Sequence, residues 1–223
     1  MTMPTLHYFD PLDFGEDFLF TVISGVFCFL IYFKTRESYN LTKYKGIKYF
    51  RDAFLFFGMS YVMRFLFSLV LLSRIAFDFI LPREIFVPLF ILPLGYFSTI
   101  GIFYLIFGSV WKRFDNKKLI IFGHALAILL SVISFMTRSH IILILLQCIL
   151  LIIAVGLRFV IQKEKRNISQ IKILYFLVAL LWLINLLVLG RRRSLSFGID
   201  IFFHIVSLIV FIFIYLKISK WVK

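Results

Sequence analysis

The sequence predicts an all-α, polytopic membrane protein in which a bundle of seven transmembrane helices makes up nearly the whole chain. Of the 223 residues, 62% are hydrophobic and only 16% are charged, whereas soluble domains contain about 25% charged residues. Long apolar runs alternate with short basic gaps, and no gap is long enough to fold by itself. Residues 1–223 are therefore expected to form a single membrane domain.

Seven apolar stretches reach or approach the length of about 20 residues that a helix needs to cross a bilayer. They are residues 17–33, 49–73, 85–111, 119–136, 141–161, 173–190 and 198–218. The first stretch is short, and the second contains Arg64. The third contains Pro88 and Pro93, and an interior proline removes a backbone hydrogen bond, so a break of this helix near Pro93 would support a transporter, in which broken helices mark substrate sites.

The distribution of lysine and arginine predicts the orientation, because basic residues accumulate in short cytoplasmic loops. Seventeen of them lie in the gaps 34–51, 112–118 and 162–172 and in the C-terminal tail, and six lie in the opposite gaps. The N-terminus is therefore expected outside the cell and the C-terminus inside. The net charge of +14 fits basic loops that face anionic lipid headgroups, and no nucleic-acid partner is expected.

Arg64 is the leading candidate for a functional residue, because an ionisable group at membrane depth is costly and usually faces the interior of a bundle. Ser60, Tyr61 and Ser68 lie on or beside the same helical face as Arg64, given their spacing. In the last helix, Asp200 and His204 are four residues apart and lie at a comparable depth. We expect Arg64 to bond to one or both of these two groups, directly or through water.

The other helices each carry a modest polar line, from which we select Thr99, His124 and Asn185 as further candidates for a ligand site or a polar seam. Small and polar residues also join membrane helices without binding a ligand, and this structural role is the alternative for each of them. Two basic groups are predicted to contact lipid headgroups or a protein partner. They are Lys43, Lys45, Lys48 and Arg51 in one predicted loop, and Arg191, Arg192 and Arg193 in another.

The sequence contains no motif that predicts an enzyme, a metal site or a cofactor. The zinc motif H-E-x-x-H, the nucleophile motif G-x-S-x-G and a glycine-rich phosphate loop do not occur. The four histidines are scattered, and Cys28 and Cys148 lie within apolar runs, so no metal ligation and no disulfide is expected.

The segment from Phe29 to Phe67 resembles part of a known membrane region. It runs from an apolar helix through Phe33-Lys-Thr-Arg-Glu and Lys45-Gly46-Ile47-Lys48-Tyr49-Phe50 into an aromatic-rich second helix. This arrangement is similar to the start of the seven-helix membrane region of sensor histidine kinases and of stand-alone archaeal membrane proteins. The sequence ends at Lys223 without a kinase domain, so no kinase output domain is expected. The resemblance implies a receptor-like, multi-pass protein of a prokaryotic plasma membrane that signals through a partner.

Three functions remain open at this point. The first is a membrane sensor that binds a small acidic or lipid-like ligand and docks a protein partner at its basic cytosolic loops. The second is a small transporter or channel that uses Arg64, Asp200 and His204 as a polar seam. The third is a scaffold subunit of a membrane complex.

Overall fold

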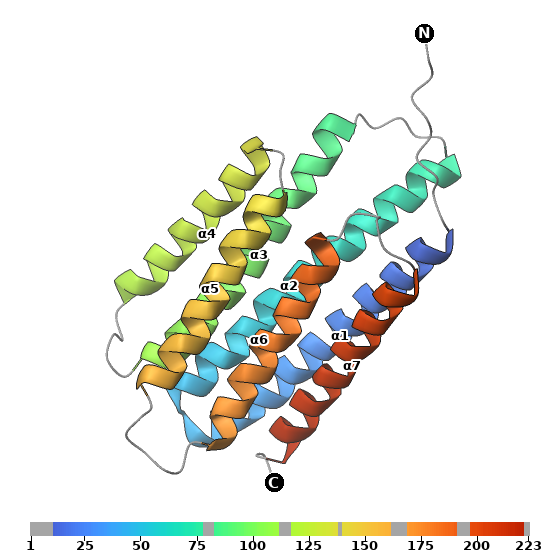
Figure 1. Cartoon of the computed structure of the whole chain (residues 1–223). Helices are drawn as coiled ribbons and strands as arrows, with labels where there is room; N and C mark the ends of the chain where they lie inside the picture. The colour runs from blue at the N-terminus through green and yellow to red at the C-terminus, as the bar shows by residue number, and fades with distance from the viewer. Residues whose placement is uncertain are drawn as a thin grey trace.

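A computed structural model describes residues 11–77, 83–111, 117–137, 140–161, 169–190 and 197–220. Within these ranges the chain forms seven helices and no strand (Figure 1). They are α1 (Pro11–Thr42), α2 (Lys45–Phe77), α3 (Arg83–Val110), α4 (Lys117–Thr137), α5 (His140–Ile161), α6 (Ser169–Gly190) and α7 (Phe197–Ser219). The predicted all-α bundle of seven helices is thus confirmed.

The described helices have the composition and exterior of a polytopic membrane protein. Five contain segments long and apolar enough to cross a membrane, namely Phe14–Thr42, Lys45–Ser73, Leu89–Val110, Lys117–Thr137 and Gly198–Ser219. α5 and α6 contribute shorter apolar segments, Ile141–Leu157 and Ile173–Val188. Large apolar side chains such as Leu145, Ile152 and Phe213 lie on the outer surface, where hydrocarbon can cover them but water would not.

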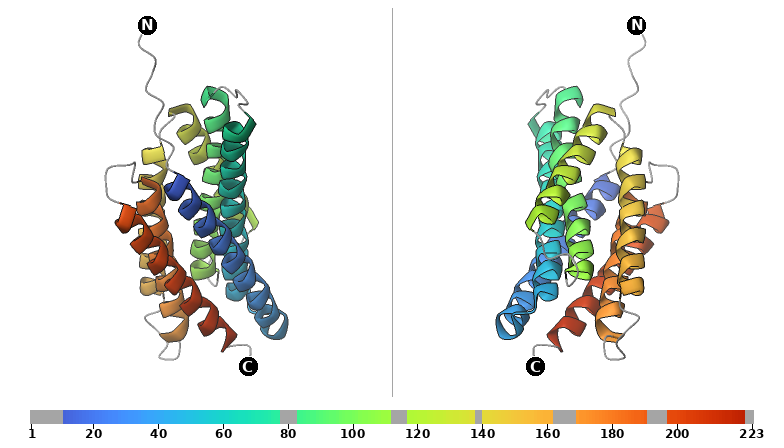
Figure 2. Two further views of the ribbon diagram at one scale, coloured as in Figure 1. Left: turned by 90° about the vertical axis from the view of Figure 1, so that its right-hand side faces the viewer. Right: turned by 90° about the vertical axis from the view of Figure 1, so that its left-hand side faces the viewer.

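Six of the helices form a closed ring. α1 packs against α2, α2 against α3, α3 against α5, α5 against α6, α6 against α7, and α7 returns to α1. α4 lies outside this ring, against α3 and to a smaller extent α5. Figures 1 and 2 show the elongated bundle with α4 at one edge and the α1–α7 pair at the other. Residues from α2 and α6 can therefore meet across the interior of the ring.

α1 and α2 are longer than the sequence predicted. The connection expected over residues 34–51 is mostly helical, because α1 continues to Thr42 and α2 begins at Lys45. Lys43, between them, adopts a positive φ of 52°, and its backbone N–H donates to the carbonyl of Tyr39 at 2.7 Å. Such a left-handed residue commonly ends a helix and reverses the chain, so the connection between α1 and α2 is a tight turn.

α3 continues through both of its prolines. The helix runs unbroken from Arg83 to Val110, so the break near Pro93 that would have supported a transporter does not occur. Proline lacks only one backbone donor, and neighbouring helices can accommodate the freed carbonyl within a membrane bundle. Gly101 lies on the face of α3 toward α2, where an added Cβ would come 2.5 Å from the ring of Phe57. Glycine is therefore needed at this point of close approach.

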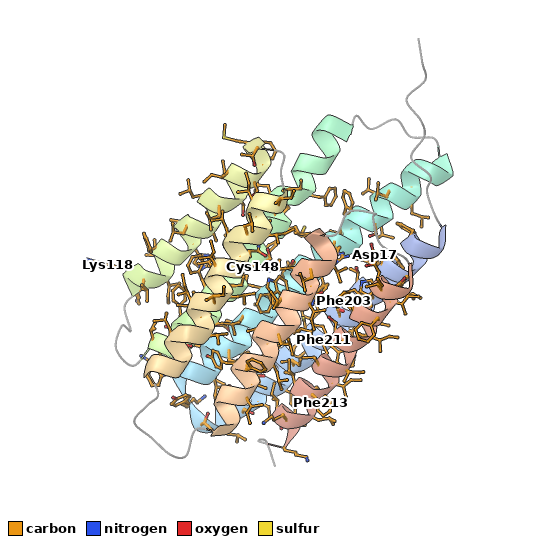
Figure 3. The ribbon with its side chains drawn as sticks, in the orientation of Figure 1. Asp17, Lys118, Cys148, Phe203, Phe211 and Phe213 are labelled. Carbon is orange, nitrogen blue, oxygen red and sulfur yellow. The ribbon has the colours of Figure 1, made fainter. Side chains whose placement is uncertain are left out.

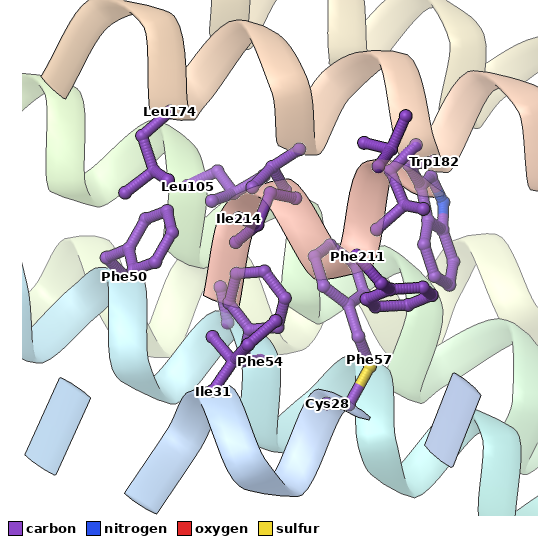
Figure 4. Packing of buried hydrophobic residues seen from close by; sticks show 14 of the residues in the cluster. Cys28, Ile31, Phe50, Phe54, Phe57, Leu105, Leu174, Trp182, Phe211 and Ile214 are labelled. Atoms are coloured by element: carbon purple, nitrogen blue, oxygen red, sulfur yellow. The ribbon is translucent and has the colours of Figure 1, made fainter. Parts of the chain in front are cut away.

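The interior of the ring is filled by aromatic and branched side chains, as Figure 4 shows. Phe54 and Phe57 of α2 are almost fully buried, as are Phe211 and Ile214 of α7. The Phe57 ring stacks on Trp182 of α6, with ring centroids 4.2 Å apart. This aromatic layer packs the middle of the bundle.

Candidate functional site

An ionic cluster joins α1, α2 and α7 at the end of the bundle where α1 begins. Arg64 Nη2 donates to Asp17 Oδ1 at 3.1 Å. His204 Nδ1 pairs with Glu16 Oε1 at 2.7 Å, and His204 Nε2 lies 3.6 Å from the same Asp17 Oδ1. Since an ionised carboxylate only accepts hydrogen bonds, Nδ1 of His204 is the donor to Glu16.

Arg64 was expected to bond to Asp200, His204 or both, directly or through water. Among the described residues no direct bond joins Arg64 to either of them, and Asp200 lies in the first turn of α7. There its negative charge complements the positive end of the helix dipole. The carboxylate between Arg64 and His204 belongs instead to Asp17, which lies in the N-terminal part of α1 and whose side chain is 52% exposed. Figure 3 labels Asp17 near this end of α1.

His204 is held in place by packing as well as by Glu16. Its ring stacks on Phe20 of α1, with centroids 4.0 Å apart and planes inclined by 21°. The residue is only 6% exposed. Its Nε2 atom is buried and has no hydrogen-bond partner. A buried, unbonded polar atom is uncommon and calls for a partner, and Asp17 is the nearest acid.

Tyr61 and Asn185 join α2 to α6 across the ring. The Tyr61 hydroxyl donates to Asn185 Oδ1 at 2.7 Å, and Asn185 Nδ2 donates to the carbonyl of Leu181 at 2.8 Å. Both residues are buried. Two of the predicted polar candidates are thus brought into direct contact, one turn of α2 away from Arg64.

Gln147 of α5 is the centre of a second buried network. Its Nε2 donates to Ser98 Oγ at 2.6 Å and to Thr99 Oγ1 at 3.0 Å. The indole Nε1 of Trp182 donates to Gln147 Oε1 at 3.4 Å. This network connects α3, α5 and α6, and it contains the predicted candidate Thr99.

A cavity of about 30 Å³ lies where these groups meet. Its lining comes from α2, α3, α5 and α6 and comprises Ser60, Tyr61, Arg64, Leu94, Ser98, Leu143, Gln147, Trp182, Asn185 and Leu186. A space of this size can hold about two water molecules where polar partners surround it. The lining combines one cation, several buried hydrogen-bonding groups and a few leucines, which is the composition expected of a small-molecule site.

Two further candidates have other roles in the structure. His124 of α4 lies outside the ring, where its Nδ1 is 2.8 Å from the Tyr96 hydroxyl and its Nε2 is 3.4 Å from the Tyr104 hydroxyl. It joins α4 to α3 and does not line the cavity. Ser68 donates to the backbone carbonyl of Arg64 at 3.1 Å, so it bonds within its own helix.

The basic residues near the turn between α1 and α2 differ in their surroundings. Lys43 is exposed and lies over the ring of Tyr39. Arg51 bonds to Asp52 at 2.6 Å and lies over the rings of Tyr32 and Tyr39, so it helps to fasten α2 to α1. Lys45 and Lys48 begin α2. The predicted basic triplet Arg191, Arg192 and Arg193 lies outside the described residues.

Sequence reasoning missed Glu16, Asp17 and the central role of Gln147. Spacing along one helix can place residues on a common face, but it carries no information about which other helix faces them. The available signal for Asp17 was its position beside the first apolar run, two residues after Gly15. Within the described part of the chain, no group of three or more His, Cys, Asp or Glu side chains converges to hold a metal ion.

The fold and the cluster define a class: a polytopic membrane protein built as a seven-helix bundle with a polar cavity. The chain is 29% identical over 211 residues to an uncharacterized protein of the archaeon Archaeoglobus fulgidus, in an alignment that covers 91% of this chain and 92% of the relative. The two proteins are distant homologues over nearly their full lengths. No protein-family profile and no solved structure match the chain.

Proposed function

We propose that the protein is an integral membrane sensor, in which a small ligand binds in the cavity beside Arg64 and the signal passes to a protein partner. The observation that carries this proposal is the convergence of buried polar groups from four helices, together with Arg64, around one cavity. An ionisable residue within a membrane bundle is a functional candidate by default because of its desolvation cost. Helix packing alone would not require this cation.

The composition of the cavity supports an amphiphilic ligand. Arg64, Tyr61 and Asn185 offer hydrogen-bonding groups to the cavity, whereas Leu94, Leu143 and Leu186 supply apolar contacts. A few placed polar groups in an apolar lining fix the orientation of a ligand. Because the cavity is only partly enclosed, a polar head about the size of two water molecules can occupy it while an apolar chain extends outward past the leucines.

We further propose that the end of the bundle containing Arg64 faces outside and that the turn between α1 and α2 faces the cytosol. The excess of basic residues at the latter end supports this orientation. The ligand would then enter from the outer leaflet. Lys43, Lys45 and Lys48 would then lie at the cytosolic surface, where anionic headgroups or an acidic protein partner can approach them.

A transporter is the second candidate, and one observation favours it. Another cavity, of about 20 Å³, lies at the opposite end of the ring and is lined by residues that include Thr35, Ser38 and Phe50. The aromatic layer around Phe57 and Trp182 separates the two cavities. A path through the bundle would require this layer to open, and the unbroken α3 lacks the discontinuous helix common in transporters.

Trp182 lines the cavity and provides a direct test of binding. In nanodiscs, a variant with Trp111→Phe and Trp221→Phe would report on Trp182 alone. It would be titrated with four amphiphiles of equal chain length: decanoate, decyl sulfate, 1-decanol and decyltrimethylammonium. We expect a saturable change in Trp182 emission with at least one of them.

Two substitutions at Ser60 supply the matched comparison, since Ser60 is buried and lines the cavity. Ser60→Leu would fill the space and should remove the response, whereas Ser60→Ala should keep it. If none of the four amphiphiles gives a saturable change, the sensor proposal is wrong. Uptake of labelled decyl sulfate into proteoliposomes that is lost in Arg64→Leu would establish the transporter instead.

A further inference from the structure

Asp17 lies between two groups that can each bind its carboxylate. Its Oδ1 atom is 3.1 Å from Arg64 Nη2 and 3.6 Å from His204 Nε2. Only the first of these distances is a hydrogen bond, since bonds of this kind are typically no longer than about 3.2 Å. Asp17 is therefore bound to Arg64, and His204 Nε2 is a nearby second partner to which it is not bonded.

His204 Nε2 provides the independent evidence that a partner is missing. The histidine is 6% exposed, and this atom has no hydrogen-bond partner. An imidazole that carries both protons donates from both nitrogens. When Nε2 takes up one proton from water, His204 can hold Glu16 through Nδ1 and Asp17 through Nε2 at the same time.

Arg64 has capacity for a second acceptor on its cavity side. A guanidinium carries five N–H donors in a planar arrangement, and among the described residues the bonded acceptor is a single oxygen of Asp17. Arg64 also lines the polar cavity. A ligand in the cavity can thus reach the same cation that Asp17 occupies from the other side.

We infer that the ligand of this site carries a carboxylate, which takes Arg64 from Asp17 and transfers Asp17 to His204. This inference rests on the proposed ligand-binding function and specifies the chemistry of that site. Guanidinium pairs with carboxylate and with phosphate through two parallel hydrogen bonds. Carboxylate is favoured because the chain's own carboxylate, Asp17, binds Arg64 in the absence of a ligand. The transfer moves the contact of α1 from α2 to α7, so ligand binding changes which helices are joined.

Competition between two anions for one cation makes a definite prediction about Asp17→Asn. The amide has nearly the same shape but no charge, so Arg64 is released for the ligand. When an internal competitor is removed, the apparent affinity rises by the inverse of the fraction of sites that were open, here up to about fivefold because the Asp17 side chain is half exposed. The dissociation constant for decanoate should fall by this factor, whereas that for 1-decanol should not change.

Two more variants test the roles of Arg64 and His204 through the same Trp182 signal. Arg64→Gln should abolish the preference for decanoate over 1-decanol while 1-decanol still binds. His204→Phe keeps an aromatic ring against Phe20 but gives Asp17 no alternative partner, so decanoate should bind more weakly. In the double variant Asp17→Asn/His204→Phe this weakening should disappear. The uncharged amide at position 17 needs no charged partner when the ligand binds Arg64.

Asp200→Asn is the matched control, since Asp200 is an acid of α7 at the same end of the bundle but does not contact Arg64. Its decanoate affinity should equal that of the wild type. Equal binding of decanoate and 1-decanol, or an unchanged decanoate affinity in Asp17→Asn, overturns the carboxylate inference while the sensor proposal stands. If no amphiphile binds, both are wrong.

Discussion

The hydroxyl group of Tyr61 donates a hydrogen bond of 2.7 Å to Oδ1 of Asn185, across the interior of a six-helix ring. The two residues are 124 positions apart in the chain, and their helices are not neighbours in the ring. The bond therefore crosses the bundle and fixes the distance between α2 and α6 on the Arg64 side of the aromatic layer.

Tyr61→Phe should lower the stability of the bundle, because it leaves the buried Asn185 Oδ1 without its donor. The expected loss in the free energy of unfolding is about 1 kcal/mol, a typical value for a buried hydrogen bond. Unfolding by denaturant in mixed micelles would measure it. Tyr215→Phe is the control, since Tyr215 is only half-buried and should leave stability unchanged. Equal stability of Tyr61→Phe and the wild type would contradict a structural role for this bond.

Gly101→Ala should destabilise the contact between α2 and α3. The added methyl group would lie 2.5 Å from Phe57, whose ring is buried and stacked on Trp182, so the aromatic layer must shift. Overpacking of a tight core typically costs about 1–3 kcal/mol. Gly156→Ala is a matched control, because an added Cβ there meets nothing within 4 Å. The melting temperature should fall for Gly101→Ala and remain the same or rise for Gly156→Ala; equal melting temperatures would refute the close approach.

Much of the fold could be predicted from the sequence because hydrocarbon selects apolar helices of a set length. The ends of α4, α5 and α7 lie close to the predicted ones. α1 and α2 extend further than predicted because charged residues such as Lys34 and Arg36 do not end a helix at the point where it leaves the apolar region. Hydropathy records the loss of apolar character there, whereas the backbone hydrogen bonds continue.

The candidate site was predictable only in part, since its assembly depends on the relative rotation of the helices. Arg64, His204 and Asn185 were recognised as polar residues within apolar runs, and each has a polar partner in the structure. Their partners could not be deduced, because the sequence does not show which helices face the N-terminal part of α1, where Asp17 lies. Asp200 has the right spacing from His204, but it lies in the first turn of α7 and makes no direct bond to Arg64.

Gln147→Leu should weaken the junction of α3, α5 and α6. The change removes the acceptor of the Trp182 indole and the donor to Ser98 and Thr99. Polar interactions between membrane helices contribute about 0.6 kcal/mol on average and at most about 2 kcal/mol, so a measurable loss of stability is expected. A double-mutant cycle with Thr99→Val in unfolding experiments would isolate one of these bonds. Strict additivity of the two substitutions would show that the bond contributes nothing.

His124→Leu should loosen α4 without affecting ligand binding. His124 bonds to Tyr96 and Tyr104 of α3, and α4 lies outside the ring. Removing the imidazole should cost about 1 kcal/mol of stability, as for other hydrogen bonds between side chains. Hydrogen exchange of α4 should become faster, whereas the Trp182 response to decanoate should match the wild type. Loss of that response would place His124 in the ligand site after all.

Cysteine labelling at Lys43 would decide the orientation of the bundle. Lys43 is exposed in the turn between α1 and α2, so Lys43→Cys presents a thiol at that end of the bundle. In intact cells a membrane-impermeant maleimide should leave it unmodified, and reaction should follow only after permeabilisation, because the basic end is proposed to face the cytosol. Cys28 is buried and Cys148 half-buried, and the wild-type protein measures their background reaction. Labelling of Lys43→Cys in intact cells would invert the orientation and place the Arg64 cavity on the cytosolic side.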